Sequence, residues 1–271
     1  MTGVVRDKYT DGLTTPTSLP GHPEGISCKG KGRRFLMQRL LSRSVLVSGS
    51  VAEWQVTDRL LLAGAVGGLL FPTVALIESA TRPGYNPWTH FVSELSLSEY
   101  GWMQIANFIV GATLILAGVG GLSRTMRSGW GPRLLGVYGL ALLAAGVFPI
   151  DPTNGYPAEV VHPVQTTAGI LHGFAGLCCF NALMLGAFVV ARYFGRRELR
   201  WALYSLAAAL TVGVCNYGSL VSSVLNASGV ATDAPTGLIQ RIAIVVGWTW
   251  FAALALHERR SAAPSQHVYR R

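Results

Sequence analysis

The chain contains 271 residues, of which 50% are hydrophobic and only 13% are charged, and its mean hydropathy is +0.39. This composition excludes a soluble globular or disordered protein, because soluble domains contain about 25% charged residues. The net charge of +9 does not indicate a nucleic-acid partner, since the basic residues form short bursts between apolar runs, as orientation signals do. The four cysteines form no C-x-x-C pair and favour neither a zinc site nor a disulfide framework.

Residues 1–57 are predicted to form a basic N-terminal region. Residues 1–32 are rich in Gly, Pro, Thr and charge, and too poor in apolar side chains to offset the entropy of ordering, so they are predicted to be disordered. Residues 33–47 mix Arg with Leu, which fits either an amphipathic helix on an anionic membrane surface or a poorly ordered leader. The sequence does not decide whether translation starts before Met37.

Six apolar runs follow, each long enough to cross a hydrocarbon core about 30 Å thick. The expected spans are residues 58–79, 103–123, 132–149, 166–192, 199–225 and 237–257. They predict an all-α, polytopic bundle of transmembrane helices over residues 58–257. A basic tail, residues 258–271, comes after the last span.

The Lys and Arg residues indicate how this bundle is oriented. Arg82 and Arg241 belong to one side, and the other 20 of the 22 basic residues belong to the opposite side. Lys and Arg are retained in the cytoplasm, so both termini are predicted to be cytoplasmic and the protein to lie in the cell membrane. Residues 80–102, 150–165 and 226–236 then face outward.

Polar residues gather near the outer ends of the spans, where they are costly in hydrocarbon and often functional. They are Glu78, Asn107, Asp151, His172 and Arg241. The outer loop 80–102 is rich in Trp, Phe and Leu, and is predicted to lie in the membrane interface or to fold over the mouth of the bundle.

Two features of the outer segments have a functional and a structural interpretation. His90 and Glu94 share one face if 88–97 is helical, which suits acid–base catalysis or metal binding. The alternative is that Glu94 forms a cap or pairs with Arg82 while His90 lies among interfacial aromatic rings. Asp151 lies between two prolines, either as a positioned acid, base or ligand or as the cap of a turn.

The remaining polar residues need partners that the sequence does not identify. His172 lies about two turns inside its span and must bond to a polar group, for which Asn107 and Asp151 are candidates. Arg241 cannot lose its proton and requires a carboxylate, a lipid phosphate or water. These groups form either a structural network or an active site. The sequence contains no G-x-S-x-G, H-E-x-x-H, Walker or dinucleotide-binding motif, so no metal or cofactor is assigned.

The order of several short motifs resembles a known family. These motifs are R-P-G-Y-N-P at 82–87, S-E-L at 93–95, Asn107, F-P-I-D at 148–151 and H-G at 172–173. Together they resemble the bacterial and archaeal membrane family called domain of unknown function 998, which implies its six-helix arrangement over residues 58–257. The matching positions implied to be site or structural residues are Arg82, Tyr85, Glu94, Asn107, Asp151 and His172. The resemblance supplies no reaction.

These observations predict an integral membrane protein with a polar pocket that opens outward or into the outer leaflet beneath loop 80–102. The leading hypothesis is an enzyme that hydrolyses a lipid, or isomerises or cyclises an isoprenoid by acid initiation. The alternative is a non-enzymatic protein that binds or transports a lipid or small solute, with the same residues as architecture. The candidate catalytic residues are Glu94, Asp151, His172 and His90, and the candidate substrate-binding residues are Arg82, Tyr85, Asn107 and Arg241. The expected partners are membrane lipids and a lipophilic small molecule.

Overall fold

A computed structural model describes residues 29–153, 155–160 and 164–263, with side chains from Ala52 onward. The chain separates into two units, Met1–Ser48 and Gly49–Arg271, and the bundle of helices belongs to the second unit. Residues 264–271 of the predicted basic tail 258–271 lie outside the described residues, as do the first 28 residues of the predicted disordered region 1–32.

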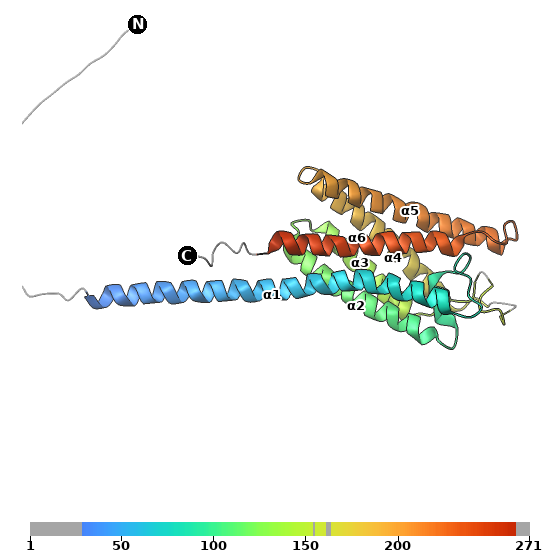
Figure 1. Cartoon of the computed structure of the whole chain (residues 1–271), viewed down its shortest axis with the longest axis horizontal. Helices are drawn as coiled ribbons and strands as arrows, with labels where there is room; N and C mark the ends of the chain where they lie inside the picture. The colour runs from blue at the N-terminus through green and yellow to red at the C-terminus, as the bar shows by residue number, and fades with distance from the viewer. Residues whose placement is uncertain (1–28, 154, 161–163, 264–271) are drawn as a thin grey trace, which may run out of the picture. The chain divides into compact units, whose positions relative to one another are not determined.

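The described residues fold entirely as helices joined by loops (Figure 1). The elements are α1 (Lys29–Thr81), the short 3₁₀ helix η1 (Val92–Leu97), α2 (Gly101–Thr125), α3 (Trp130–Val147), α4 (Thr167–Phe194), α5 (Leu199–Ala227) and α6 (Thr236–Ala262). Within this part of the chain, α2 to α6 and the Ala52–Thr81 part of α1 are the six helices long and apolar enough to cross a membrane. The all-α fold with six spans is therefore confirmed.

The limits of the helices differ modestly from the expected spans. α3 ends at Val147 rather than at Pro149, because Phe148 adopts an extended backbone (φ −99°, ψ 111°), and the residue that follows it is a proline that disfavours further helix. α1 begins at Lys29, so residues 33–47, for which the sequence left two interpretations, are helical.

Glycines let the helices of the bundle approach closely. A Cβ atom at Gly64 would lie 2.6 Å from the Cα of Gly118 on α2, and one at Gly68 would lie 2.7 Å from the Trp248 carbonyl oxygen on α6. α1 thus packs against α2 at the first glycine and against α6 at the second, as small-xxx-small pairs permit. Trp248 also stacks on Phe71, with ring centroids 4.2 Å apart.

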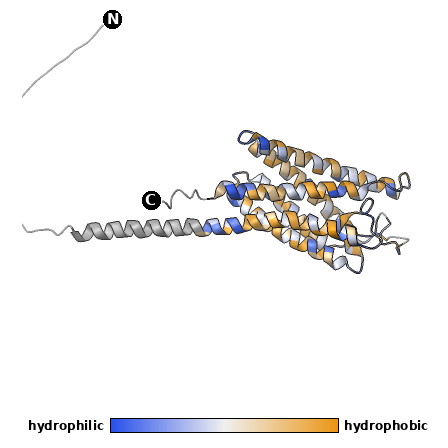
Figure 2. Cartoon of the chain, viewed as in Figure 1, coloured by the Kyte–Doolittle hydropathy of each residue, from blue (hydrophilic) through white to orange (hydrophobic). Residues whose placement is uncertain are grey.

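The sides of the bundle are apolar and its ends carry the polar loops (Figure 2). Large hydrophobic side chains such as Phe174 and Val214 are mostly exposed, which is the expected surface of helices that face lipid. The described residues between α1 and α2, between α3 and α4, and between α5 and α6 lie at one end of this unit (Figure 1). The candidate site lies at that end.

Candidate functional site

Arg241, in the first turns of α6, gathers the loop that follows α1. Its guanidinium is buried and donates to the carbonyl oxygens of Pro87 (2.8 Å) and His90 (3.0 Å). It also donates to the Ser79 hydroxyl (2.9 Å) and to the Tyr85 hydroxyl. Among the described residues, Arg241 thus bonds to carbonyl and hydroxyl oxygens and forms no ion pair with a carboxylate.

The same loop closes the N-terminus of α6. The Trp88 carbonyl oxygen accepts hydrogen bonds from the backbone N–H groups of Gly237 (2.9 Å) and Leu238 (3.2 Å). These two N–H groups have no partner within their own helix, so the loop supplies it. A Cβ at Gly237 would collide with the His90 carbonyl oxygen, which explains why glycine occupies this position.

Tyr85 and His90 pack together under this loop. The Tyr85 hydroxyl lies within hydrogen-bonding distance of the carbonyl oxygens of His90 (3.1 Å) and Phe91 (2.8 Å). Burial raises the pKa of Tyr85 to about 12, against the opposing effect of the positive Arg241. The His90 ring accepts a hydrogen bond at Nδ1 from the Asn86 backbone N–H (2.9 Å) and packs edge-on to Tyr85. His90 therefore lies in an aromatic cluster with a polar anchor.

Glu94 joins two outer loops. It is fully buried, and its Oε2 accepts a hydrogen bond of 2.6 Å from the Phe91 backbone N–H. Its Oε1 accepts from both the backbone N–H (3.1 Å) and the hydroxyl (2.8 Å) of Thr153. One carboxylate thereby fixes the start of η1 and the segment after α3.

Asp151 is bonded to the start of α4. Its two oxygens accept hydrogen bonds from the Thr166 backbone N–H (2.8 Å) and the Thr166 hydroxyl (2.7 Å). The Thr166 hydroxyl oxygen in turn accepts from the Gly169 backbone N–H (3.0 Å), as an N-capping residue does. A Cβ at Gly169 would overlap the Asp151 carboxylate, so a glycine lies beneath it.

Arg82 and Asn107 connect α1 with the segment that follows it. Arg82 pairs with Glu78 one turn earlier (2.8 Å) and donates to the Ser98 hydroxyl. The Asn107 amide on α2 donates to the Phe71 carbonyl oxygen on α1 (3.1 Å). The arginine therefore pairs with Glu78 and not with Glu94, which takes the capping role that was the other structural alternative for it.

His172 is the predicted site residue that borders a cavity. Its Nδ1 lies 3.0 Å from the Ala145 carbonyl oxygen and 2.8 Å from the Phe148 carbonyl oxygen, both at the end of α3. The cavity has a volume of about 60 Å³ and lies beneath η1, between α2, α3, α4 and α6. Its wall is mainly apolar and includes Phe108 and Trp248.

A few polar side chains also border this cavity, namely Ser93, Tyr138, His172 and Gln240. Gln240 is partly engaged, since its side-chain oxygen accepts from the Val92 backbone N–H (2.8 Å). Tyr138 is only 1% exposed, and its hydroxyl has no hydrogen-bond partner within the described part of the chain. Sequence reasoning missed Ser93, Tyr138 and Gln240 as cavity residues. The available signal was a tyrosine in the middle of an apolar span.

The predicted site residues thus fall into distinct positions. Tyr85, His90 and Arg241 form one cluster, Glu94 and Asp151 tie separate loops, and His172 borders the cavity. In the described ranges, no three or more His, Cys, Asp or Glu side chains are grouped as they would be to hold a metal ion.

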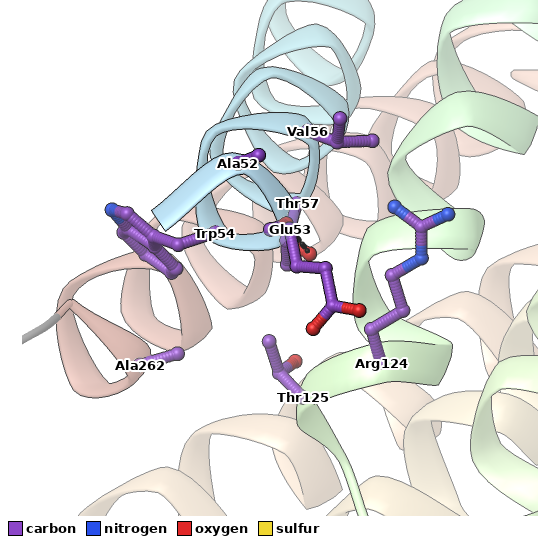
Figure 3. Close-up of a pocket in the computed structure, with 8 residues that line it drawn as sticks. All are labelled: Ala52, Glu53, Trp54, Val56, Thr57, Arg124, Thr125 and Ala262. Carbon is purple, nitrogen blue, oxygen red and sulfur yellow. Dashed lines mark hydrogen bonds between the residues drawn. The ribbon is translucent and has the colours of Figure 1, made fainter. Parts of the chain in front are cut away.

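A second cavity, of about 780 Å³, lies at the other end of the bundle (Figure 3). Residues from the start of the first span, the end of α2 and the end of α6 surround it. Glu53 and Arg124 line it from different helices (Figure 3). Both side chains are exposed. The buried Thr57 also lines this cavity, but its hydroxyl donates to the Glu53 carbonyl oxygen (2.9 Å) and so already has a partner.

Six long apolar helices with polar loops define an α-helical, multi-pass membrane protein. The chain belongs to the family described as protein of unknown function (DUF998), whose model matches residues 65–257. This match confirms the resemblance that the motifs indicated. The same comparisons find no matching curated protein and no matching solved structure.

Proposed function

We propose that this protein binds a lipophilic molecule inside the membrane, in the cavity beneath η1. The observation that carries this proposal is Tyr138, a side chain that borders the cavity and whose buried hydroxyl has no hydrogen-bond partner among the described residues. A buried, unpaired hydroxyl costs about 1–3 kcal/mol, so a ligand that pairs with it gains affinity. Apolar pockets with a few convergent polar groups are the usual form of small-molecule sites.

We place the entrance to the cavity from the lipid beside Gly176. Gly176 borders the cavity on α4, and a Cβ atom there would meet no other atom within 4 Å. Phe180, one turn further along α4, also borders the cavity and is partly exposed. A cavity of this volume exceeds what a single water needs, about 10–15 Å³, and suits the end of a longer molecule. The remainder of the ligand would extend past Gly176 into the bilayer.

The distribution of basic residues supports a location in the cell membrane with both termini in the cytoplasm. In that orientation, loops 82–100 and 148–166 face outward, and the cavity beneath η1 opens into the outer leaflet. The ligand would then be a component of that leaflet or a lipophilic molecule that enters it from outside.

Catalysis on the bound molecule is the second candidate function, and the orientation of His172 favours it. The carbonyl oxygens of Ala145 and Phe148 fix Nδ1 of His172, so Nε2 is the nitrogen that could act on a substrate, as in a positioned general base. Glu94 and Asp151 are less suited to the acid–base roles suggested by the sequence. Their oxygens already accept hydrogen bonds from backbone and hydroxyl groups, which they would have to release.

Photo-crosslinking tests the binding proposal. The full chain, purified in mild detergent, is incubated with 16-carbon probes that carry a mid-chain diazirine and end in a hydroxyl or a methyl ether. We expect adducts on the peptides that border the cavity, and at least a several-fold reduction in Gly176→Leu, whose side chain fills the entrance. Gly173→Leu is the matched control, because Gly173 lies on the same helix with equally open surroundings but does not border the cavity. The absence of cavity adducts with both probes would refute the proposal.

A further inference from the structure

We infer that the polar group of the bound molecule is a hydroxyl, so that the ligand is a neutral, long-chain lipophilic alcohol. This inference rests on the binding function proposed above and specifies the chemistry of the same cavity. Its basis is two polar side chains that border the cavity, His172 and Tyr138, the second of which has a hydroxyl without a hydrogen-bond partner among the described residues.

The contacts of His172 fix which ring nitrogen carries the proton. Nδ1 faces the carbonyl oxygens of Ala145 and Phe148, and a carbonyl oxygen can only accept a hydrogen bond. Nδ1 is therefore the protonated nitrogen. A second proton on the ring would place a charge in an apolar interior at considerable cost. Nε2 consequently carries a lone pair and accepts a hydrogen bond.

The ligand must therefore donate a hydrogen bond to His172. Tyr138 needs a partner as well, and its hydroxyl can donate to an oxygen of the ligand. A single ligand hydroxyl meets both demands, because it donates to His172 with its hydrogen and accepts from Tyr138 with its oxygen. An ether or an aldehyde only accepts, so it would leave Nε2 of His172 unpaired.

The charges around the cavity exclude an ionic head group. No Lys, Arg, Asp or Glu is among the described residues that border it. The nearby Arg241 already donates to Pro87, His90, Ser79 and Tyr85. A phosphate or carboxylate in the cavity would be buried without a counter-ion, which is strongly unfavourable.

The size of the cavity indicates how such an alcohol would lie. A volume of about 60 Å³ holds the hydroxyl and the first few carbons. The rest of the chain passes Gly176, where open space lies beside the helix. A long, thin alcohol fits this arrangement better than a compact one, because most of its apolar surface stays in lipid.

Competition among head groups tests the inference on the detergent-purified full chain. Unlabelled hexadecanol, hexadecyl methyl ether, hexadecanal and hexadecyl phosphate each compete with the diazirine alcohol for the cavity peptides. We expect hexadecanol to compete about ten times better than the ether and the aldehyde, as one buried hydrogen bond would provide, and the phosphate to compete least. Tyr138→Phe should weaken hexadecanol about tenfold, whereas Tyr204→Phe, at an exposed position on α5, should not change it.

The outcomes separate this inference from the function on which it rests. If the ether or the aldehyde competes as well as the alcohol, the hydroxyl inference is wrong while binding in the cavity stands. If hexadecyl phosphate competes better than hexadecanol, the hydroxyl inference is likewise wrong while binding in the cavity stands. If no probe labels the cavity peptides of the wild-type chain, the binding function itself fails.

Discussion

Replacing Tyr138 with Phe should stabilise the ligand-free protein while it weakens ligand binding. The Tyr138 side chain is 1% exposed and lies in the middle of α3, with its hydroxyl unpaired among the described residues. Its ring packs edge-on against Trp248, with centroids 5.7 Å apart, and Phe preserves this contact. The substitution therefore removes the unpaired oxygen and little else.

The expected gain follows from the cost of a buried, unpaired polar group. That cost is about 1–3 kcal/mol in the free energy of unfolding. In a protein of this size, 1 kcal/mol shifts the midpoint of thermal unfolding by about 2–4 °C. The ligand-free Tyr138→Phe variant should thus melt at least about 2 °C above the wild type.

Thermal unfolding of delipidated protein in detergent measures this difference. Tyr85→Phe is the matched control, since it removes the same atom from a hydroxyl that bonds to Arg241, and it should lower the midpoint. Adding hexadecanol should raise the midpoint of the wild type more than that of Tyr138→Phe. A ligand-free Tyr138→Phe variant that melts below the wild type would show that the hydroxyl is paired within the protein, and the reasoning would fail.

The loop contacts lead to three other predictions. Arg241→Met removes the donor from four acceptors and should lower the free energy of unfolding by about 3 kcal/mol or more. Limited proteolysis should then cut faster within residues 82–100, and an unchanged digestion pattern would contradict this prediction. Glu94→Gln should lower the free energy of unfolding by about 1–2 kcal/mol, measured by thermal unfolding, because an amide has one accepting oxygen for the three donors that Glu94 serves. Loss of function with unchanged stability would instead favour a catalytic role for Glu94. The pKa of Tyr85 is about 12 in the folded protein and about 10 in the unfolded chain. Its neutral form therefore contributes about 2–3 kcal/mol to the free energy of unfolding below pH 10, and this contribution is lost as the pH rises to 12. Tyr85→Phe should therefore show a shallower fall in melting temperature over that interval.

Arg241 and Asp151 both bond to partners that their positions in the sequence did not identify. Arg241 was expected to find a carboxylate, a lipid phosphate or water, and it bonds instead to backbone carbonyl and hydroxyl oxygens of the loop that follows α1. Asp151 had a turn-capping and a functional interpretation, and it bonds to Thr166, fifteen positions along the chain. Spacing along a chain cannot reveal such partners, because they depend on how a loop returns to the bundle.

The sequence by itself determined the six spans and the family, because both depend on local properties. A hydrocarbon core requires about 20 apolar residues per crossing, and this requirement can be read from each segment alone. Short motifs in a fixed order likewise identified the family. Only the tertiary structure decided which polar residues border the cavity, since α2, α3, α4 and α6 must pack before Tyr138 and His172 line one space. The Tyr138 hydroxyl has no partner among the described residues, and such an absence can be recognised only once the neighbouring helices are in place.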